Sequence, residues 1–162
     1  MERTLVYRKE FPVVLFGACL ITLCSFVRIP FYPVAFTLQT FAIFLIALTQ
    51  RPKQAFVSVL GYLGFAFMMN PHCFVGKCGG YFIAFPIAAY LTSLLSKKYS
   101  PLFAVLSGQA IIYALGFLWL IPFVGMKIAA FNGVAIFIGS DLLKNLIAIR
   151  LGRKYGISDT SI

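Results

Sequence analysis

The chain has 162 residues, of which 61% are hydrophobic and only 11% are charged, and its mean hydropathy is +0.95. Soluble domains carry about 25% charged residues, so this composition excludes an ordinary soluble domain and favours a polytopic membrane protein. The net charge of +10 would suit a nucleic-acid partner, but the basic residues stand at the ends of apolar runs, where they orient helices in a membrane. We therefore expect no nucleic acid among the partners.

Prolines, glycines and charges divide the chain into apolar segments that predict six transmembrane helices. The first five are expected at 12–27, 36–48, 55–69, 81–95 and 102–121. The fifth should end at Pro122, because proline interrupts a helix. The segment after it is either one long helix or a short piece followed by a last span starting near Gly139. Gly133 and the triplet GSD favour the break, since Ser140 or Asp141 could cap a new helix.

No hydrophilic segment is long enough to form a second domain, so residues 1–162 are expected to form one all-α transmembrane domain. Alternate connections place most basic residues on one side: Arg3, Arg8, Lys9, Arg51, Lys53, Lys97, Lys98, Arg150, Arg153 and Lys154. By the positive-inside rule both termini are expected in the cytoplasm. The loops at 28–36, 70–80 and 122–134 would then face outward.

Small residues in the first segment predict a close helix contact. Ala18 and Thr22 are four residues apart, and such pairs let another helix approach closely. The approaching helix could belong to this chain or to a partner protein.

The second segment begins with polar residues, in the stretch TLQT. Gln39 offers two amide donors and one acceptor, which suits an amide-like or urea-like ligand. Polar residues at a helix start also often bond only to the backbone or to neighbouring helices, so both interpretations stay open.

The loop NPHCFVGKCGG combines glycines with His72, Cys73 and Cys78. Gly79 and Gly80 would let the backbone approach a ligand closely. We expect no metal site, because no second pair of ligands stands at a suitable spacing. Gly76 and Lys77 do not form a phosphate-binding loop, since no glycine stands five residues earlier. The two cysteines could form a disulfide in an oxidising compartment or stay free.

The last segment holds two ionisable residues, Asp141 and Lys144, among apolar ones. On a helix, Asp141, Lys144, Asn145 and Ala148 share one face. An ionisable residue within a span costs at least about 2.5–3.5 kcal/mol and usually faces a cavity or the bundle interior. The pair is either a binding site for a small ligand or a structural ion pair. With one histidine and four acids, acid–base catalysis has few candidates, and we expect neither an enzyme nor a cofactor.

Three stretches, TLQTFAIFLIAL, GKCGGYFIAF and GSDLLKNLIA, together resemble the BioY family, the biotin-specific substrate-binding components of energy-coupling factor transporters. The resemblance covers essentially the whole chain. It implies six helices, a biotin pocket toward the outer face, and a covering loop between the first two helices. It also implies a transmembrane coupling protein and two ATPases as partners, contacted through small residues of the first helix such as Ala18 and Thr22.

The chemistry of biotin predicts how it would be held, and the resemblance implies how it would be moved. Phe36 and Tyr81 would enclose its rings. Asp141, Gln39 and Asn70 would contact its ureido group, and Lys144 would bind the carboxylate or orient Asp141. The loaded component would tip over in the membrane, driven by the partners. A binding component for another vitamin and a membrane scaffold without a ligand are the alternatives.

Overall fold

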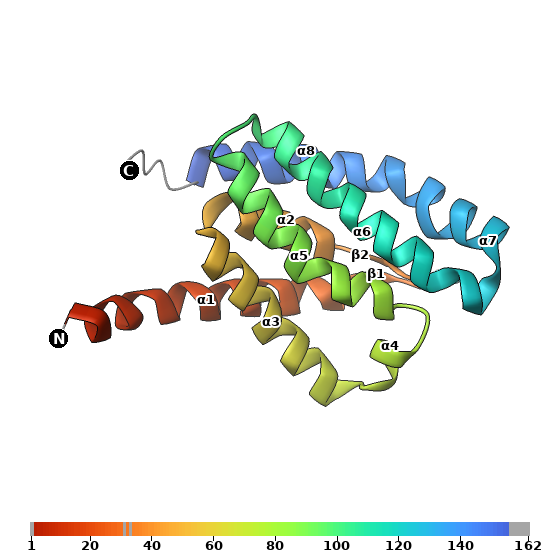
Figure 1. Cartoon of the computed structure of the whole chain (residues 1–162), viewed down its shortest axis with the longest axis horizontal. Helices are drawn as coiled ribbons and strands as arrows, with labels where there is room; N and C mark the ends of the chain where they lie inside the picture. Colours follow the sequence, from red (N-terminus) through yellow and green to blue (C-terminus); the bar gives the residue numbers. More distant parts are fainter. Residues whose placement is uncertain (1, 31, 33, 156–162) are drawn as a thin grey trace.

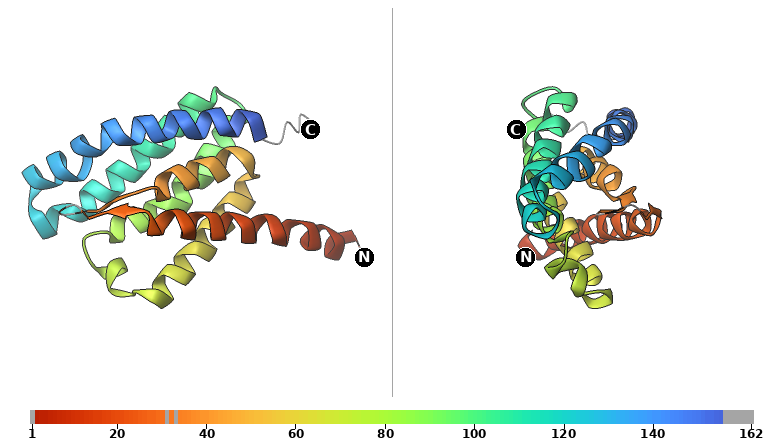
Figure 2. Two further views of the ribbon diagram at one scale, coloured as in Figure 1. Left: turned by 180° about the vertical axis from the view of Figure 1, so that it is seen from behind. Right: turned by 90° about the vertical axis from the view of Figure 1, so that its right-hand side faces the viewer.

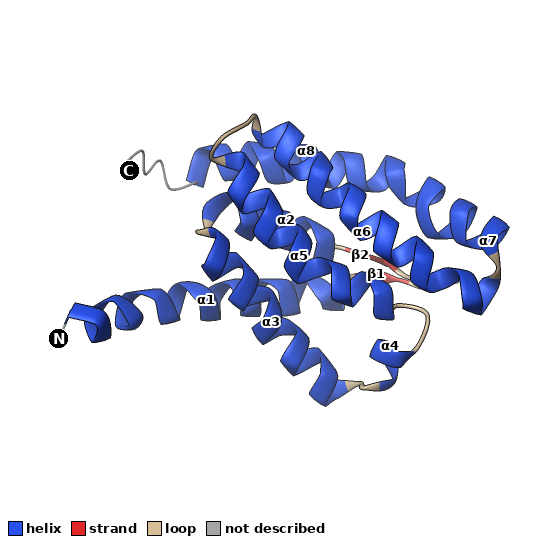
Figure 3. Cartoon of the chain, in the orientation of Figure 1, coloured by secondary structure: helices blue, strands red, loops and turns tan. Residues whose placement is uncertain are grey.

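Helices account for nearly all of the chain that the structure describes (Figure 3). The structure is a computed structural model that describes residues 2–30, 32 and 34–155, with no side chains for 2–9 and 155. The side chains of Arg3, Arg8 and Lys9, used above for orientation, lie outside this set. The elements are α1 (Glu2–Phe26), β1 (Arg28–Ile29), β2 (Phe36–Thr37), α2 (Gln39–Thr49), α3 (Pro52–Met69), α4 (His72–Val75), α5 (Gly79–Ser96), α6 (Pro101–Val124), α7 (Met126–Ala130), the π-helix η1 (Phe131–Ala135) and α8 (Ile136–Tyr155).

The long helices pack into one bundle in which α5 lies along α6, α1 against α3, and α2 against α8 (Figure 1). The start of α1 and the end of α8 lie at the same end of the molecule, as Figure 1 and the left view of Figure 2 show. The strands, α4 and α7 lie at the opposite end. This arrangement fits the prediction that both termini share one side of a membrane; which side that is stays a prediction.

Helix α6 continues through Pro122 to Val124, so the predicted end at Ile121 was wrong. Proline removes one backbone donor and crowds the preceding turn, yet the helix continues for two residues beyond it, and the Gly125 N–H still donates to the Ile121 carbonyl at 2.8 Å. The helix ends instead at Gly125, whose φ of 81° lies in the region that favours glycine.

The predicted break before the last helix was also wrong. Helix α7, η1 and α8 follow one another without a non-helical residue, and α8 begins at Ile136. The Ser140 hydroxyl donates to the Phe137 carbonyl within the helix, and Asp141 bonds to other helices rather than capping this one. The irregularity that Gly133 suggested is present as a π-helix, which widens the turn without ending it.

Two small elements were not predicted. Strands β1 and β2 pair antiparallel, with Arg28 opposite Thr37 and Ile29 opposite Phe36. The loop 70–78 contains the single-turn helix α4. Each fixes the backbone of a connection that we expected to be irregular.

The molecular surface is unusually apolar. Phe16, Leu23, Met68, Leu118 and Leu143 are all more than half exposed. Water-soluble monomers rarely expose such side chains in continuous patches, so this surface suits lipid. Among the described residues, α5 and α6 are long and apolar enough to span a bilayer, while α2 and α1 from Glu10 are apolar but shorter. The six spans therefore remain a prediction.

A buried polar cluster joins four helices near the end where the termini lie. The Gln50 amide donates to the Val13 carbonyl at 2.9 Å, and the Ser58 hydroxyl donates to Gln50 Oε1 at 2.9 Å. The Ser93 hydroxyl donates to the Gln50 carbonyl at 2.7 Å. Helix α1 reaches this cluster through Gly17, where a Cβ would lie 2.6 Å from both Gln50 Nε2 and Ser58 Oγ.

We predict that Gly17→Ala lowers the free energy of unfolding by about 1–3 kcal/mol, because the added methyl group would overpack this contact. Gly64→Ala is the matched control, since nothing lies within 4 Å of a Cβ there. Thermal melting in one detergent compares them. Equal melting temperatures for the two variants would show that α1 does not depend on this contact.

Candidate ligand-binding site

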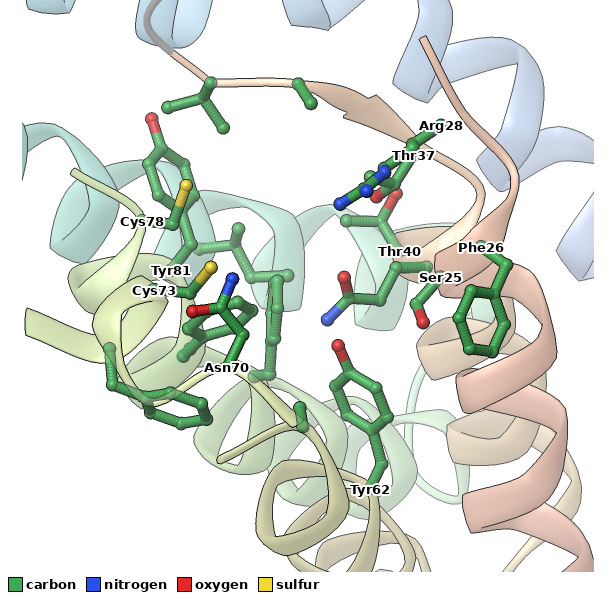
Figure 4. Close-up of a pocket in the computed structure, with 18 of the residues that line it drawn as sticks. Ser25, Phe26, Arg28, Thr37, Thr40, Tyr62, Asn70, Cys73, Cys78 and Tyr81 are labelled. Carbon is green, nitrogen blue, oxygen red and sulfur yellow. The ribbon is translucent and has the colours of Figure 1, made fainter. Parts of the chain in front are cut away.

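A cavity of about 280 Å³ is lined by residues of α1, α2, α3, α5, α6 and α8 and of the connections 28–37 and 70–78. Figure 4 shows polar groups on two sides of it: Ser25, Arg28, Thr37 and Thr40 on one, and Asn70, Cys73, Cys78 and Tyr81 on the other. Tyr62 points its hydroxyl toward the space between them. The remaining wall is largely aromatic and aliphatic: Phe26, Val34, Phe65, Met69, Phe74, Phe82, Phe85, Ile112 and Phe137. Such a mixture suits a small molecule with an apolar body and a few polar groups.

The ion pair predicted from the last helix lies in the wall of this cavity. Lys144 Nζ is 2.6 Å from Asp141 Oδ1 and also donates to the Thr37 carbonyl at 3.1 Å. Asp141 is 3% exposed. An ammonium group has three donors, so Lys144 keeps one beyond these two bonds.

The other oxygen of Asp141 is held by helix α6. Tyr113 donates its hydroxyl to Asp141 Oδ2 at 2.8 Å, and Gln109 Nε2 donates to the same oxygen at 3.1 Å. Asn145 Nδ2 donates to Gln109 Oε1 at 3.3 Å, which fixes the orientation of the Gln109 amide. Because a carboxylate offers about four acceptor positions, Oδ1 can accept one further donor.

The predicted face of the last helix is confirmed. Asp141, Asn145 and Ala148 are buried, whereas Leu142 and Leu143 on the other side are exposed. We did not single out Gln109 and Tyr113 from the sequence. Their spacing of four residues on one face of a predicted helix was the available signal, but nothing in it indicates a carboxylate partner on another helix.

Two buried polar atoms beside the cavity have no hydrogen-bond partner among the residues that the structure describes: Gln39 Nε2 and Thr40 Oγ1. Both residues line the cavity, and Gln39 is 5% exposed. A buried donor without a partner costs about 1–3 kcal/mol, so such groups call for an explanation. A ligand in the cavity that accepts a hydrogen bond from Gln39 Nε2 would explain why this donor is unpaired in the ligand-free protein.

The nine residues predicted to bind substrate divide into two groups. Asp141, Lys144, Gln39, Asn70 and Tyr81 line the cavity. The other four do not: Phe36, Gly79, Gly80 and Asn145. Whether any of them binds a ligand stays a prediction.

Those four support the wall from behind. Phe36 stacks on Phe137, which lines the cavity, with ring centroids 4.2 Å apart. Asn145 donates to Gln109, which in turn holds Asp141 in the wall. Gly79 and Gly80 lie against Trp119.

Tyr81 presents its ring rather than its hydroxyl to the cavity. The hydroxyl donates to the Gly133 carbonyl in η1 at 2.9 Å. The ring fits because residue 116 is glycine, since a Cβ there would overlap it. Tyr81 therefore joins the cavity wall to the π-helix.

Arg28, which we did not single out from the sequence as a binding residue, also lines the cavity. Its strand β1 pairs with β2, whose Thr37 carbonyl binds Lys144. Two cations thus lie along one side of the site. The place of Arg28 in the sequence did not predict that it lines the cavity, because the sequence does not show that the connection between α1 and α2 folds back on itself as β1 and β2.

The two loop thiols are free and both line the cavity. Burial raises the pKa of the Cys78 thiol, nearby Cys73 raises it further, and Lys77 lowers it. Cys78 is therefore a weak nucleophile near neutral pH. Among the described residues no three His, Cys, Asp or Glu side chains are grouped to hold a metal ion.

Of the two small residues predicted to form a helix contact in α1, Ala18 faces another helix of the same bundle. Ala18 Cβ lies 3.4 Å from the place of a Cβ on Gly61 of α3. The Thr22 hydroxyl donates to the Ala18 carbonyl at 2.8 Å. This favours the internal contact for Ala18, while a partner contact of α1 remains a prediction.

We predict that Lys144→Met destabilises the ligand-free protein by about 3–5 kcal/mol, because it leaves the Asp141 carboxylate buried without its cation. The double variant Asp141→Asn, Lys144→Met should recover most of this loss. Thermal melting without ligand measures both. A single variant as stable as the wild type would mean that the pair does not stabilise the bundle.

Residues 2–157 match the BioY family. A Thermotoga maritima protein named "Biotin transporter BioY" is 34% identical over 150 residues, which cover 82% of this chain and 89% of that protein. A Pyrococcus horikoshii protein named "Probable biotin transporter BioY" is 33% identical over 155 residues, covering 90% and 95%. In fold, the chain is similar to the crystal structure of the S-component for biotin from an ECF-type ABC transporter. The TM-score is 0.81 and the identity 23%, over 91% of this chain and 90% of that one.

Proposed function

The chain belongs to the BioY family, and from this premise we propose that it binds biotin and serves as the substrate-binding component of a biotin uptake transporter. Its relatives are named as transporters and its surface is strongly apolar, so it is a membrane protein. We place it in the cytoplasmic membrane of a bacterium, with the cavity facing outward.

The observation that carries the proposal is a hydrogen-bonded ion pair in the wall of a mainly apolar cavity. Biotin has a bicyclic body, a ureido group with two N–H donors and one carbonyl, and a carboxylate on an alkyl chain. A site for it needs an acceptor for the N–H groups, donors for the carbonyl, and apolar walls. The third donor of Lys144 and the free acceptor position on Asp141 Oδ1 provide the first two.

We assign each remaining polar group to the part of biotin that matches its charge or its unused hydrogen-bond donor or acceptor. Gln39 Nε2 has no partner, so it donates to a ligand acceptor. Arg28 provides a second cation at the cavity and binds the carboxylate. Asn70 lies across the cavity from Arg28 and makes a further polar contact (Figure 4). The ring of Tyr81 covers one side of the bicyclic body.

We propose that transport requires an energy-coupling module, comprising a transmembrane coupling protein and two ATPases. The exposed apolar side of α1, with Leu15 and Leu23, is available to such a partner. The basic residues at the ends of the helices, such as Arg51 and Lys97, would then face the cytoplasm, where the ATPases act. Delivery would follow from tipping of the loaded component in the membrane.

We predict that Asp141→Asn weakens biotin binding by about 10- to 100-fold, because the loss of a charged acceptor removes a strong hydrogen bond. Equilibrium binding of radiolabelled biotin to the purified protein measures this. Glu10→Gln is the control, since it neutralises an acid that does not line the cavity. Unchanged affinity in folded Asp141→Asn would remove this carboxylate from the binding site.

We predict that Gln39→Leu weakens biotin binding by about 3- to 10-fold without lowering the stability of the ligand-free protein. The amide donor has no partner to lose when the cavity is empty, so only the bound state should suffer. Binding and thermal melting are measured on the same preparation. A loss of stability with unchanged affinity would indicate a structural role instead.

A competition assay separates biotin from other vitamins. Unlabelled biotin should displace the radiolabelled compound, whereas thiamin and riboflavin should not, because neither has a carboxylate or a ureido group on a bicyclic body. Displacement by either would reassign the substrate. If no vitamin raises the melting temperature, the protein is a scaffold without a ligand.

A further inference from the structure

Trp119, near the end of α6, holds the loop that precedes α5. Its indole N–H donates to the Gly76 carbonyl at 3.0 Å. The indole also lies against Gly79 and Gly80, the first two residues of α5. One side chain thus contacts both the loop and the start of the helix that the loop enters.

The two glycines leave room for this indole. A Cβ on Gly79 would lie 2.8 Å from Trp119 Cε2 and would overlap the Phe74 carbonyl. A Cβ on Gly80 would overlap Trp119 Cβ and lie 2.6 Å from the Leu115 carbonyl. No other residue fits at either position. This gives the glycine pair a different role from close approach to a ligand, which we expected from the sequence.

The loop held by Trp119 forms one wall of the cavity. Asn70, Cys73 and Cys78 all come from it, and Figure 4 shows them along the same side of the space. Phe74 anchors the middle of the loop between Phe67 and Phe82, with ring centroids 5.4 Å and 4.7 Å away. The part that follows α4 is held by Trp119, which itself does not line the cavity.

We propose that Trp119 is a positioning residue that fixes this wall against the cavity and thereby slows the release of substrate. The proposal rests on the proposed function only for the identity of the substrate. A wall segment held at its middle and at the part that enters α5 gives a bound molecule fewer ways out, and differences of this kind appear mainly in the dissociation rate.

The test compares Trp119→Phe, which keeps an aromatic ring but loses the N–H donor, with two controls. Leu118→Phe changes the neighbouring residue, which is 62% exposed. Gly17→Ala destabilises the bundle at the other end, so it controls for loss of stability alone. Trp119→Tyr is the second variant, for use if the phenylalanine variant does not fold.

Two rates are measured. The first is the release of radiolabelled biotin from the loaded protein. The second is alkylation of Cys73 and Cys78 by a maleimide in the ligand-free protein, with Cys19 and Cys24 replaced by alanine. We expect Trp119→Phe to accelerate both by about tenfold, as loss of one hydrogen bond and part of the packing would do. Both controls should match the wild type.

Wild-type values of both rates in the folded Trp119 variants would overturn the proposal. So would equal acceleration in Gly17→Ala, since that would trace the effect to stability. If the wild type binds no biotin, the proposed function fails, and the alkylation rates still decide whether Trp119 holds the wall. Because Trp119 is the single tryptophan in the chain, its emission also reports directly on this contact. We expect that emission to shift when biotin binds to the wild type.

Discussion

The buried ion pair between Asp141 and Lys144 is the constraint around which the cavity is organised. A carboxylate and an ammonium in apolar surroundings are tolerated only when every remaining donor and acceptor is nearly satisfied. Here that requirement draws three parts of the chain to one point. Thr37 at the end of β2 supplies a carbonyl, and Gln109 and Tyr113 of α6 supply donors. The same bonds that stabilise the pair also leave one donor and one acceptor position for a ligand.

The site is asymmetric in a way that suits a molecule with distinct polar and apolar parts. Ionic groups and an unpartnered amide, Gln39 Nε2, come from one set of elements. The thiols come from the loop 70–78, and that loop and the start of α5 supply several of the aromatic rings. Further rings come from α3 and α8, such as Phe65 and Phe137. Glycines at 79, 80 and 116 make room for the rings of Trp119 and Tyr81. Much of the wall is therefore shaped by residues that do not touch the cavity.

Several features could be predicted from the sequence because they depend on local chemistry. Hydrophobic runs and their breakers gave α2, α3 and α5 nearly to their ends, and helical periodicity placed Asp141 and Asn145 on the buried face. The predicted start of the first helix at Pro12 was wrong, because α1 begins at Glu2 and continues through that proline. The end of α6 and the start of α8 were mispredicted. At those points several breakers compete, and the choice between them is not a local one at η1, where the Tyr81 hydroxyl of another helix donates to the Gly133 carbonyl.

The sequence by itself determined an apolar helical chain with one charged pair in its last helix, since composition and periodicity are properties of the chain alone. Only the tertiary structure decided which groups bond to that pair, because Gln109 lies 32 residues from Asp141, and Thr37, whose backbone carbonyl accepts from Lys144, lies 107 residues from it. It also decided that Arg28 faces the cavity and that Gly79 and Gly80 make room for an indole. Contacts between distant segments depend on how helices pack, and no local pattern encodes them.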